Sequence, residues 1–227
     1  MAYQFDFQAV LVHWPLLLQG VWVTLQITAI ATVLGILLGS VCAALRTSQV
    51  RWARIAVTVY VEIIRNTPLL IQAYFLIFGL ASLGFRLPFI LGATLALTVN
   101  VGAYTTEIVR AGIQSIRRGQ LEAAECLGLT KLQTYLHVII RPALERVYPA
   151  LTSQYVLLML FSSIVSAVGV DELFGMANRI QSETFRNFEI FVVIGVIYVA
   201  LAAFVRLFFW ALGQVLFPRR LKLGTPL

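Results

Sequence analysis

The sequence predicts an all-α membrane protein that crosses the bilayer about five times. Hydrophobic residues make up 60% of the 227 residues, charged residues only 12%, and the mean hydropathy is +0.89. Stretches of 20 or more residues carry no charge, and about 20 apolar residues in a helix cross the roughly 30 Å hydrocarbon layer. A soluble protein of this composition would lack polar residues to cover its core, so membrane helices explain it better.

The two ends of the chain are expected to lie on opposite sides of the membrane. Residues 1–14 contain Asp6 and lack the basic start of a cleavable signal peptide, so we expect a retained extracytoplasmic segment. Residues 15–216 are expected to form one transmembrane domain, and 217–227 a cytoplasmic tail.

The first span is predicted within 15–45. It contains Gly35 and Gly39, a spacing that places two small residues on one helix face and lets another helix approach closely. We interpret this pair as a helix-packing site rather than as a dimerisation signal.

The second span, within 55–80, is interrupted by polar residues. Glu62 and Arg65 share one helix face, and a charge at the bilayer centre costs about 2.5–3.5 kcal/mol on insertion scales. Two interpretations remain open: the two residues form a mutual ion pair, or Arg65 lines a pathway and meets a substrate carboxylate. Pro68 frees nearby carbonyls, which is tolerated where the chain lines a cavity.

The third span covers 87–108 and presents three polar residues on one face. Asn100, Tyr104 and Glu107 follow one another at spacings of four and three. Asn100, near the middle of the membrane, is the best candidate for substrate contact. Tyr104 serves either this contact or packing, and Glu107 lies near the cytoplasmic surface, where it could anchor the next loop.

The last two spans cover about 147–169 and 189–216, with Arg206 near the inner end of the fifth. The positive-inside rule places the side that is richer in Lys and Arg in the cytoplasm. This rule predicts an outside N-terminus and a cytoplasmic C-terminus, because only Arg86, Arg179 and Arg186 fall on the other side. The basic residues expected in the cytoplasm are Arg46, Arg51, Arg54, Arg110, Arg117, Arg118, Lys131, Arg141, Arg146, Arg219, Arg220 and Lys222.

A compact polar segment, 119–142, separates spans three and four. Residues 120–127 are good helix formers, Glu122 would lie in the first turn, and Gly128 is suited to end the helix in a left-handed conformation. Such a short helix needs a surface on which to pack. Anionic lipid headgroups would repel its glutamates, so we expect a protein partner.

A second short helix is expected directly after the first. Thr130 and Gln133 form a capping-box pattern at its start, and Pro142 is expected to stop it. The segment is therefore predicted to be two short helices joined by a tight turn at the cytoplasmic face.

Several motifs together resemble the permease subunits of bacterial ABC importers, and in particular the polar amino acid group for histidine, glutamine and glutamate. The segment around 119–128 resembles that family's EAA coupling loop, which docks into a groove of a cytoplasmic ATPase. The resemblance covers about 20–216. The motifs that carry it are Gly119-Gln120-x-Glu122-Ala123-Ala124-x-x-Leu127-Gly128, Glu62-x-x-Arg65-Asn66-Thr67-Pro68, Ala103-Tyr104-x-x-Glu107 and Ser163-Ile164-Val165-Ser166-x-x-Gly169-Val170-x-Glu172-Leu173.

The resemblance implies a type I ABC importer permease fold, with a coupling loop at about 115–142, in the bacterial inner membrane. Its expected partners are an ABC ATPase dimer, a second homologous permease and a periplasmic or lipid-anchored amino acid binding protein. ATP and Mg²⁺ would be bound by the ATPase, because this chain has no Gly-Lys pair of a phosphate-binding loop and no cofactor is expected on it. The predicted ATPase-coupling residues are Gly119, Gln120, Glu122, Ala123, Ala124, Leu127 and Gly128, and the predicted pathway residues are Arg65, Thr67, Asn100, Tyr104, Phe161 and Ser163.

One departure from the family concerns the fourth span. Many relatives have Lys-Asp where this chain has Leu160-Phe161, before Ser162-Ser163. In the family this region faces the central cavity, so the missing acid predicts an asymmetric heterodimer whose second subunit supplies most of the amino acid contacts. A homodimer that relies on the binding protein for selection is the alternative.

Other function classes fit the sequence less well. A channel or ion-coupled carrier that works alone would need a chain of intramembrane acids or an internal repeat, and neither is visible. No metal-ligand cluster or nucleophile–base motif indicates an enzyme, and the distribution of basic residues between spans does not indicate nucleic-acid binding. The two cysteines predict neither a disulfide framework nor a metal site.

Overall fold

The computed structural model describes residues 4–218, which form helices joined by short loops and contain no β-strand. The tail residues Arg219, Arg220 and Lys222 lie outside this range. The helices in chain order are α1 (Gln8–Leu11), α2 (Trp14–Thr47), α3 (Arg51–Arg65), α4 (Leu69–Tyr74), η1 (Phe75–Gly79), α5 (Leu80–Ser82), α6 (Phe89–Gln114), α7 (Arg118–Cys126), α8 (Lys131–Gln133), η2 (Thr134–Ile140), α9 (Arg141–Phe161), η3 (Ser162–Val168), α10 (Leu173–Thr184) and α11 (Asn187–Leu216).

The predicted all-α membrane architecture is confirmed. Four continuous helical stretches are long and apolar enough to cross a membrane, and they run over Trp14–Thr47, Phe89–Gln114, Lys131–Val168 and Asn187–Leu216. The fifth candidate is a bent pair: α3 and the stretch Leu69–Ser82 are long and apolar enough only together, and they meet at 111°. The interruption that the polar residues predicted in the second span is therefore a sharp break in the helix.

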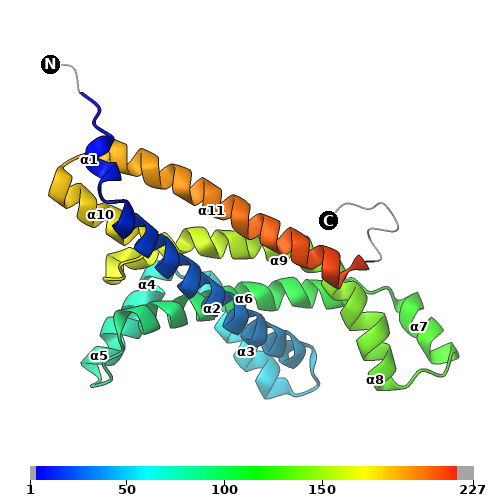
Figure 1. Ribbon diagram of the computed structural model, residues 1–227. Helices are drawn as coiled ribbons and strands as arrows, with labels where there is room; N and C mark the ends of the chain where they lie inside the picture. The colour runs from blue at the N-terminus through cyan, green and yellow to red at the C-terminus, as the bar shows by residue number, and fades with distance from the viewer. Residues whose placement is uncertain (1–3, 219–227) are drawn as a thin grey trace.

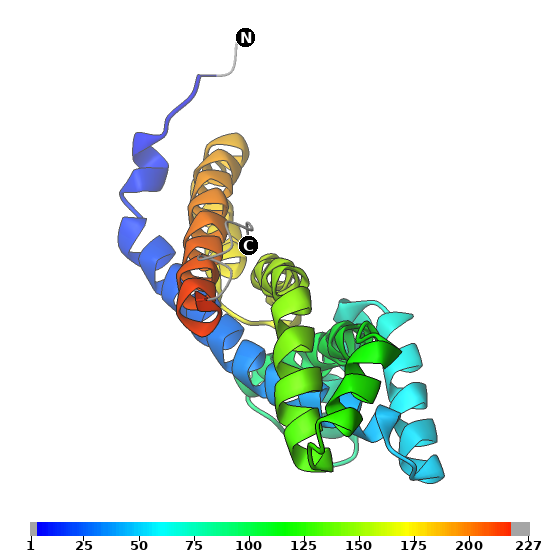
Figure 2. The same cartoon turned by 90° about the vertical axis from the view of Figure 1, so that its right-hand side faces the viewer.

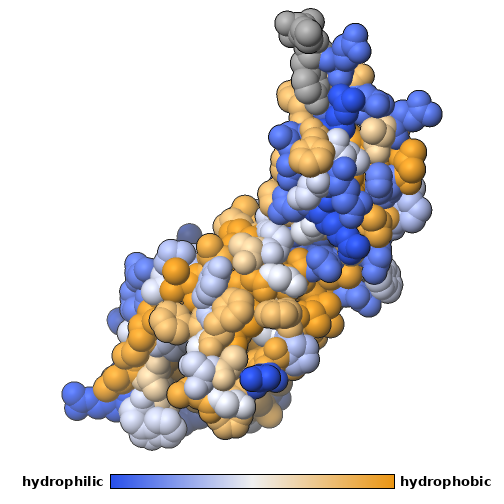
Figure 3. Space-filling view, turned by 90° about the vertical axis from the view of Figure 1, so that its left-hand side faces the viewer, coloured by the Kyte–Doolittle hydropathy of each residue, from blue (hydrophilic) through white to orange (hydrophobic). Residues whose placement is uncertain are grey.

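The long helices give the molecule two distinguishable ends (Figure 1). The short helix α7 stands apart at one of them, which we call the α7 end. The helices α1 and α10 lie at the opposite end, which we call the α10 end. Figure 3 shows hydrophilic side chains gathered around the N-terminal segment and hydrophobic ones over much of the rest of that face.

The close packing of α2 against α6 depends on the two glycines of the first span. A methyl group added at Gly35 would collide with a side-chain carbon of Val101, and one added at Gly39 would collide with the side chain of Thr105. Any larger residue would push the helices apart, so the prediction that this spacing serves helix packing is confirmed.

The prediction that Pro142 stops a short helix is wrong. The chain stays helical from Lys131 to Val168, so the second short helix is the first part of the fourth span. The preceding segment η2 has wider, i→i+5 turns, which move its carbonyls away from the position where the proline ring would clash.

Candidate functional site

The helix α7 is exposed on almost all sides. Ala124, at 2% exposure, is its one buried residue, whereas Glu122 and Ala123 are exposed and Leu127, just after the helix, is 77% exposed. The helix begins at Arg118, earlier than expected, so Glu122 lies in the second turn and not in the first. Glu122 is therefore too far from the helix start to be stabilised there by the helix dipole. The exposed face of α7 does not pack against the described residues of this chain.

The connection from α7 to the fourth span is defined by local chemistry. Gly128 has φ +68°, as predicted, and its N–H donates to the carbonyl of Glu125. The capping box is also present: the Thr130 hydroxyl accepts from the Gln133 N–H at 3.3 Å, and Gln133 Oε1 accepts from the Thr130 N–H at 2.9 Å. Because α8 continues into the long fourth span, a movement of α7 has a direct route into the membrane domain.

The break in the second span is held by Gln72. Its Nε2 donates to the carbonyl oxygen of Ile64 at 2.8 Å, and to the carbonyl and hydroxyl oxygens of Thr67 at 3.0 and 2.9 Å. These contacts satisfy carbonyls at the end of α3 that the bend leaves without helix partners. Gln72 was not predicted from the sequence, although a glutamine just after a proline in an otherwise apolar run was an available signal.

Asn100 supports the same break from α6. It is 5% exposed, and its Nδ2 donates to Gln72 Oε1 at 3.0 Å. The side-chain amide of Asn100 is therefore hydrogen-bonded within the protein, and it shares its partner, Gln72, with Thr67. The sequence placed Asn100 on a polar face of the third span but could not identify the residue that it meets.

The strongest concentration of charge surrounds Glu107. Its carboxylate forms ion pairs with three arginines. Arg110 of the same helix lies at 2.7 Å and Arg65, at the end of α3, at 3.9 Å, and the third partner is Arg46 from the last turn of α2. Three helices are joined by one carboxylate whose side chain is 18% exposed. Glu107 therefore joins the ends of three membrane helices, a larger role than anchoring the loop that follows it.

Arg65 does not form the ion pair with Glu62 that the sequence left open. Glu62 instead accepts from the Asn66 side chain at 3.2 Å, and within residues 4–218 no ion pair joins it to Arg65. The guanidinium of Arg65 lies 5.3 Å from the centre of the Tyr104 ring, a cation–π arrangement, and its side chain is 41% exposed. The physical reason is that α3 ends at Arg65, so the side chain reaches α6 and not back along its own helix.

The other two predicted pathway residues lie at the junction of α9 and η3. Phe161 is 37% exposed, and the Ser163 hydroxyl donates to the carbonyl of Leu160 at 2.8 Å. The η3 segment packs beside α4, since Val165 and Val168 share a buried cluster with Leu69. Among the other predicted pathway residues, Arg65 contacts Tyr104, and Thr67 and Asn100 share Gln72 as a hydrogen-bond partner. Phe161 and Ser163 belong to the region of α9 and η3.

A buried carboxylate lies toward the α10 end. Glu172 is fully buried, and it accepts from Tyr198 of α11 at 2.9 Å, from Thr24 of α2 at 3.3 Å and from the Gly175 N–H at 2.9 Å. Its motif was recognised in the sequence, but its role in joining three helices was not.

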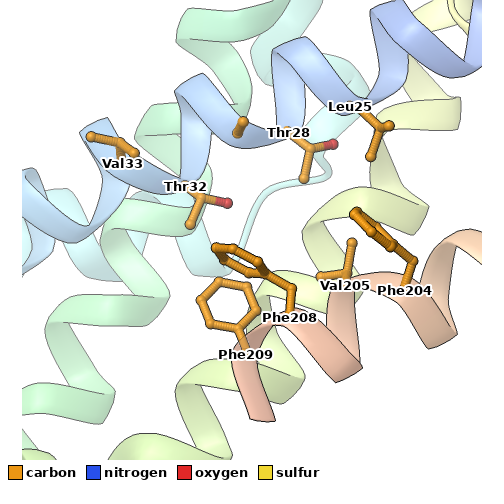
Figure 4. Close-up of a pocket in the computed structure, with 9 residues that line it drawn as sticks. Leu25, Thr28, Thr32, Val33, Phe204, Val205, Phe208 and Phe209 are labelled. Carbon is orange, nitrogen blue, oxygen red and sulfur yellow. The ribbon is translucent and has the colours of Figure 1, made fainter. Parts of the chain in front are cut away.

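The lining of one groove includes none of these polar groups. This groove has a volume of about 360 Å³ and runs between α2 and α11, lined by apolar side chains and two threonines (Figure 4). Thr28 and Thr32 of α2 face the side chains of α11 across it. No charged group lines the groove, so it is a poor place to hold a charged small molecule.

Comparisons with known proteins all indicate the same family. Residues 35–218 match the family described as "Binding-protein-dependent transport system inner membrane component". The chain is 32% identical over 213 residues to an octopine transport system permease protein of Rhizobium radiobacter. The aligned region covers 90% of this chain and 87% of the relative. It is 34% identical to a probable glutamine ABC transporter permease protein of Bacillus subtilis, with 83% of this chain and 88% of the relative covered.

Solved structures agree with these relatives. An amino acid ABC transporter crystallised with histidines superposes with a TM-score of 0.87 at 33% identity, over 93% of this chain and 99% of that chain. The MetNI methionine ABC transporter superposes with a TM-score of 0.74 at 22% identity, which supports the fold alone. The resemblance to polar amino acid permeases is confirmed, and the chain belongs to the family of binding-protein-dependent transport system inner membrane components.

Proposed function

We propose that this chain is one half of the translocation pathway of an ATP-driven importer for polar amino acids, with its N-terminus outside and the α7 end in the cytoplasm. Relatives that are named for glutamine and octopine transport support the substrate class. The distribution of basic residues supports the orientation.

The observation that carries the proposal is the exposure of α7. A helix of nine residues is not stable alone in water, and Ala124 is its one buried side chain. The coupling residues Gly119, Gln120, Glu122 and Leu127 present an acidic and partly apolar surface that suits a protein groove. We infer that a separate ATPase, which binds ATP and Mg²⁺, docks there and drives the fourth span through the capping-box connection.

The Arg65 region is the proposed contact for the substrate carboxylate. A guanidinium has five N–H donors. The guanidinium of Arg65 makes one long ion pair, with Glu107, and one contact with the ring of Tyr104. It lies at a break where irregular backbone is exposed, and in a membrane such backbone requires protein or water around it. Water and substrate on this side of α3 and α4 satisfy that requirement.

A second homologous permease is proposed to complete the pathway, and a binding protein to deliver the amino acid. Leu160 and Phe161 cannot pair with a substrate ammonium group. Of the carboxylates near Arg65, Glu107 is occupied by three arginines and Glu62 accepts from the Asn66 side chain. The acid that meets the ammonium group is therefore assigned to the second subunit.

Reconstitution tests the proposal. This chain is placed in liposomes with its ATPase and binding protein, with and without a second homologous permease, and ATP-driven uptake of radiolabelled amino acids is measured. We expect uptake only when all four components are present. Full uptake without the second permease would establish a homodimer, and uptake by this chain without ATPase or ATP would establish a stand-alone channel or carrier.

A further inference from the structure

One face of α11 is exposed along the whole crossing. Its residues recur at spacings of three, four or seven, which places them on a single stripe of the helix. Only 28% of the most apolar 18-residue stretch of α11 is buried, compared with 67% for α6. The stripe consists of Phe188, Val192, Val196, Val199, Arg206 and Trp210, all exposed.

The dimensions of this stripe match the membrane. At about 1.5 Å per residue, the distance from Phe188 to Trp210 is roughly 33 Å, close to the roughly 30 Å hydrocarbon thickness. Trp210 marks one end, as tryptophan does at membrane interfaces, and phenylalanines lie at the other end. At the α10 end, the ring of Phe188 lies 5.3 Å from that of Phe5, and Phe185 beside them is 81% exposed.

The stripe lies on the flank opposite the broken helix pair. α11 and α3 occupy opposite sides of the molecule in Figure 1 and again in Figure 2. The side of α3 and α4 exposes Arg65, Asn66 and Thr67, which need water or protein around them, whereas the middle of the α11 stripe exposes valines that need neither. Lipid is therefore the occupant that fits the α11 stripe.

Arg206 is the exception within this apolar stripe. It is exposed, and among residues 4–218 it has no hydrogen-bond or ion-pair partner. A charged side chain inside a membrane span requires a counter-charge or water. Arg206 lies one turn, or about 6 Å, deeper than Trp210, a distance that a snorkelling arginine side chain can bridge toward the headgroup level.

We propose that Arg206 binds the phosphate of an anionic phospholipid in the leaflet at the α7 end, with Trp210 beside the headgroup and the valines of α11 against the acyl chains. The planar guanidinium suits two hydrogen bonds to phosphate oxygens. Anionic lipids are concentrated on the cytoplasmic surface, which matches the proposed orientation.

The test titrates phosphatidylglycerol into the full-length chain, purified in mild detergent with the subunits that accompany it, and measures the thermal unfolding midpoint. Half-saturation in the Arg206→Gln variant should require about fivefold more phosphatidylglycerol, because one arginine near an anionic surface contributes about 1 kcal/mol. Arg206→Lys should retain most of the effect. Arg179→Gln, an exposed arginine at the α10 end, is the matched control and should behave as the parent protein. Identical lipid dependence of Arg206→Gln and the parent overturns the proposal.

A second measurement separates lipid from a protein partner. Val199→Cys is labelled with a fluorophore in a Cys42→Ser, Cys126→Ser background and placed in vesicles that contain lipids with nitroxides on their acyl chains. We expect strong quenching and no oxidative cross-link between permease subunits. Protection from quenching, or a disulfide from the introduced thiol to a second subunit, would assign the stripe to a subunit interface instead.

Discussion

Replacement of Glu107 by Gln removes the carboxylate that three arginines share. The side chains of Arg46 and Arg110 are 17% and 26% exposed, so both charges would remain in a poorly hydrated site without a counter-charge. Removing one partner of a fully buried pair costs about 3–5 kcal/mol, and exposed pairs are worth about 0–1 kcal/mol. For this partly buried cluster we expect a loss of about 2–3 kcal/mol in the free energy of unfolding.

The loss is measured by denaturant unfolding in mild detergent, next to a matched control. Glu183→Gln removes an ion pair with Arg179 whose side chains are 50% and 60% exposed, and it should cost less than about 1 kcal/mol. Adding Arg46→Gln to Glu107→Gln should restore part of the stability, because it removes one uncompensated charge. If Glu107→Gln is no less stable than Glu183→Gln, the idea that this carboxylate joins three helices is wrong.

Three further predictions concern other parts of the chain. Gly128→Val should strain a left-handed position by about 1–2 kcal/mol, and ATP-driven uptake should fall while membrane insertion, measured by fractionation, persists; normal uptake would contradict the role of this turn. Glu172→Leu removes the acceptor that Tyr198, Thr24 and the Gly175 N–H share, so the free energy of unfolding should fall by about 1–3 kcal/mol; an unchanged denaturant midpoint would rule this out. A cysteine at Ser182 should react with an impermeant thiol reagent outside the cell and one at Gln133 should not, and the reverse pattern would invert the proposed topology.

The sequence was sufficient for features that depend on local patterns. Long apolar stretches located the four continuous membrane helices and the bent pair. Gly128 and the Thr130–Gln133 pair were identified because turn and cap chemistry is encoded within a few residues. The small-residue spacing at Gly35 and Gly39 likewise predicted a close helix contact, although not that α6 provides it.

Features that depend on contacts between distant segments could not be predicted. Arg65 and Glu62 are neighbours on an ideal helix, but the helix ends at Arg65, so Glu107 of α6 becomes the counter-charge. Gln72 and Asn100 are 28 positions apart, and nothing in either local pattern indicates that they meet. Pro142 is a usual helix terminator, yet a widened turn before it lets the helix continue.

Cys126 offers a direct probe of ATPase docking on α7. It is exposed at the end of this helix, whereas Cys42, the other cysteine, is buried, so a maleimide reagent should label α7 selectively. In inside-out membrane vesicles, we expect labelling of Cys126 to be slow when the ATPase is bound and to accelerate severalfold when the ATPase is stripped away. Equal labelling rates with and without the ATPase, in vesicles that retain ATP-driven uptake when it is bound, would show that this helix is not the docking surface.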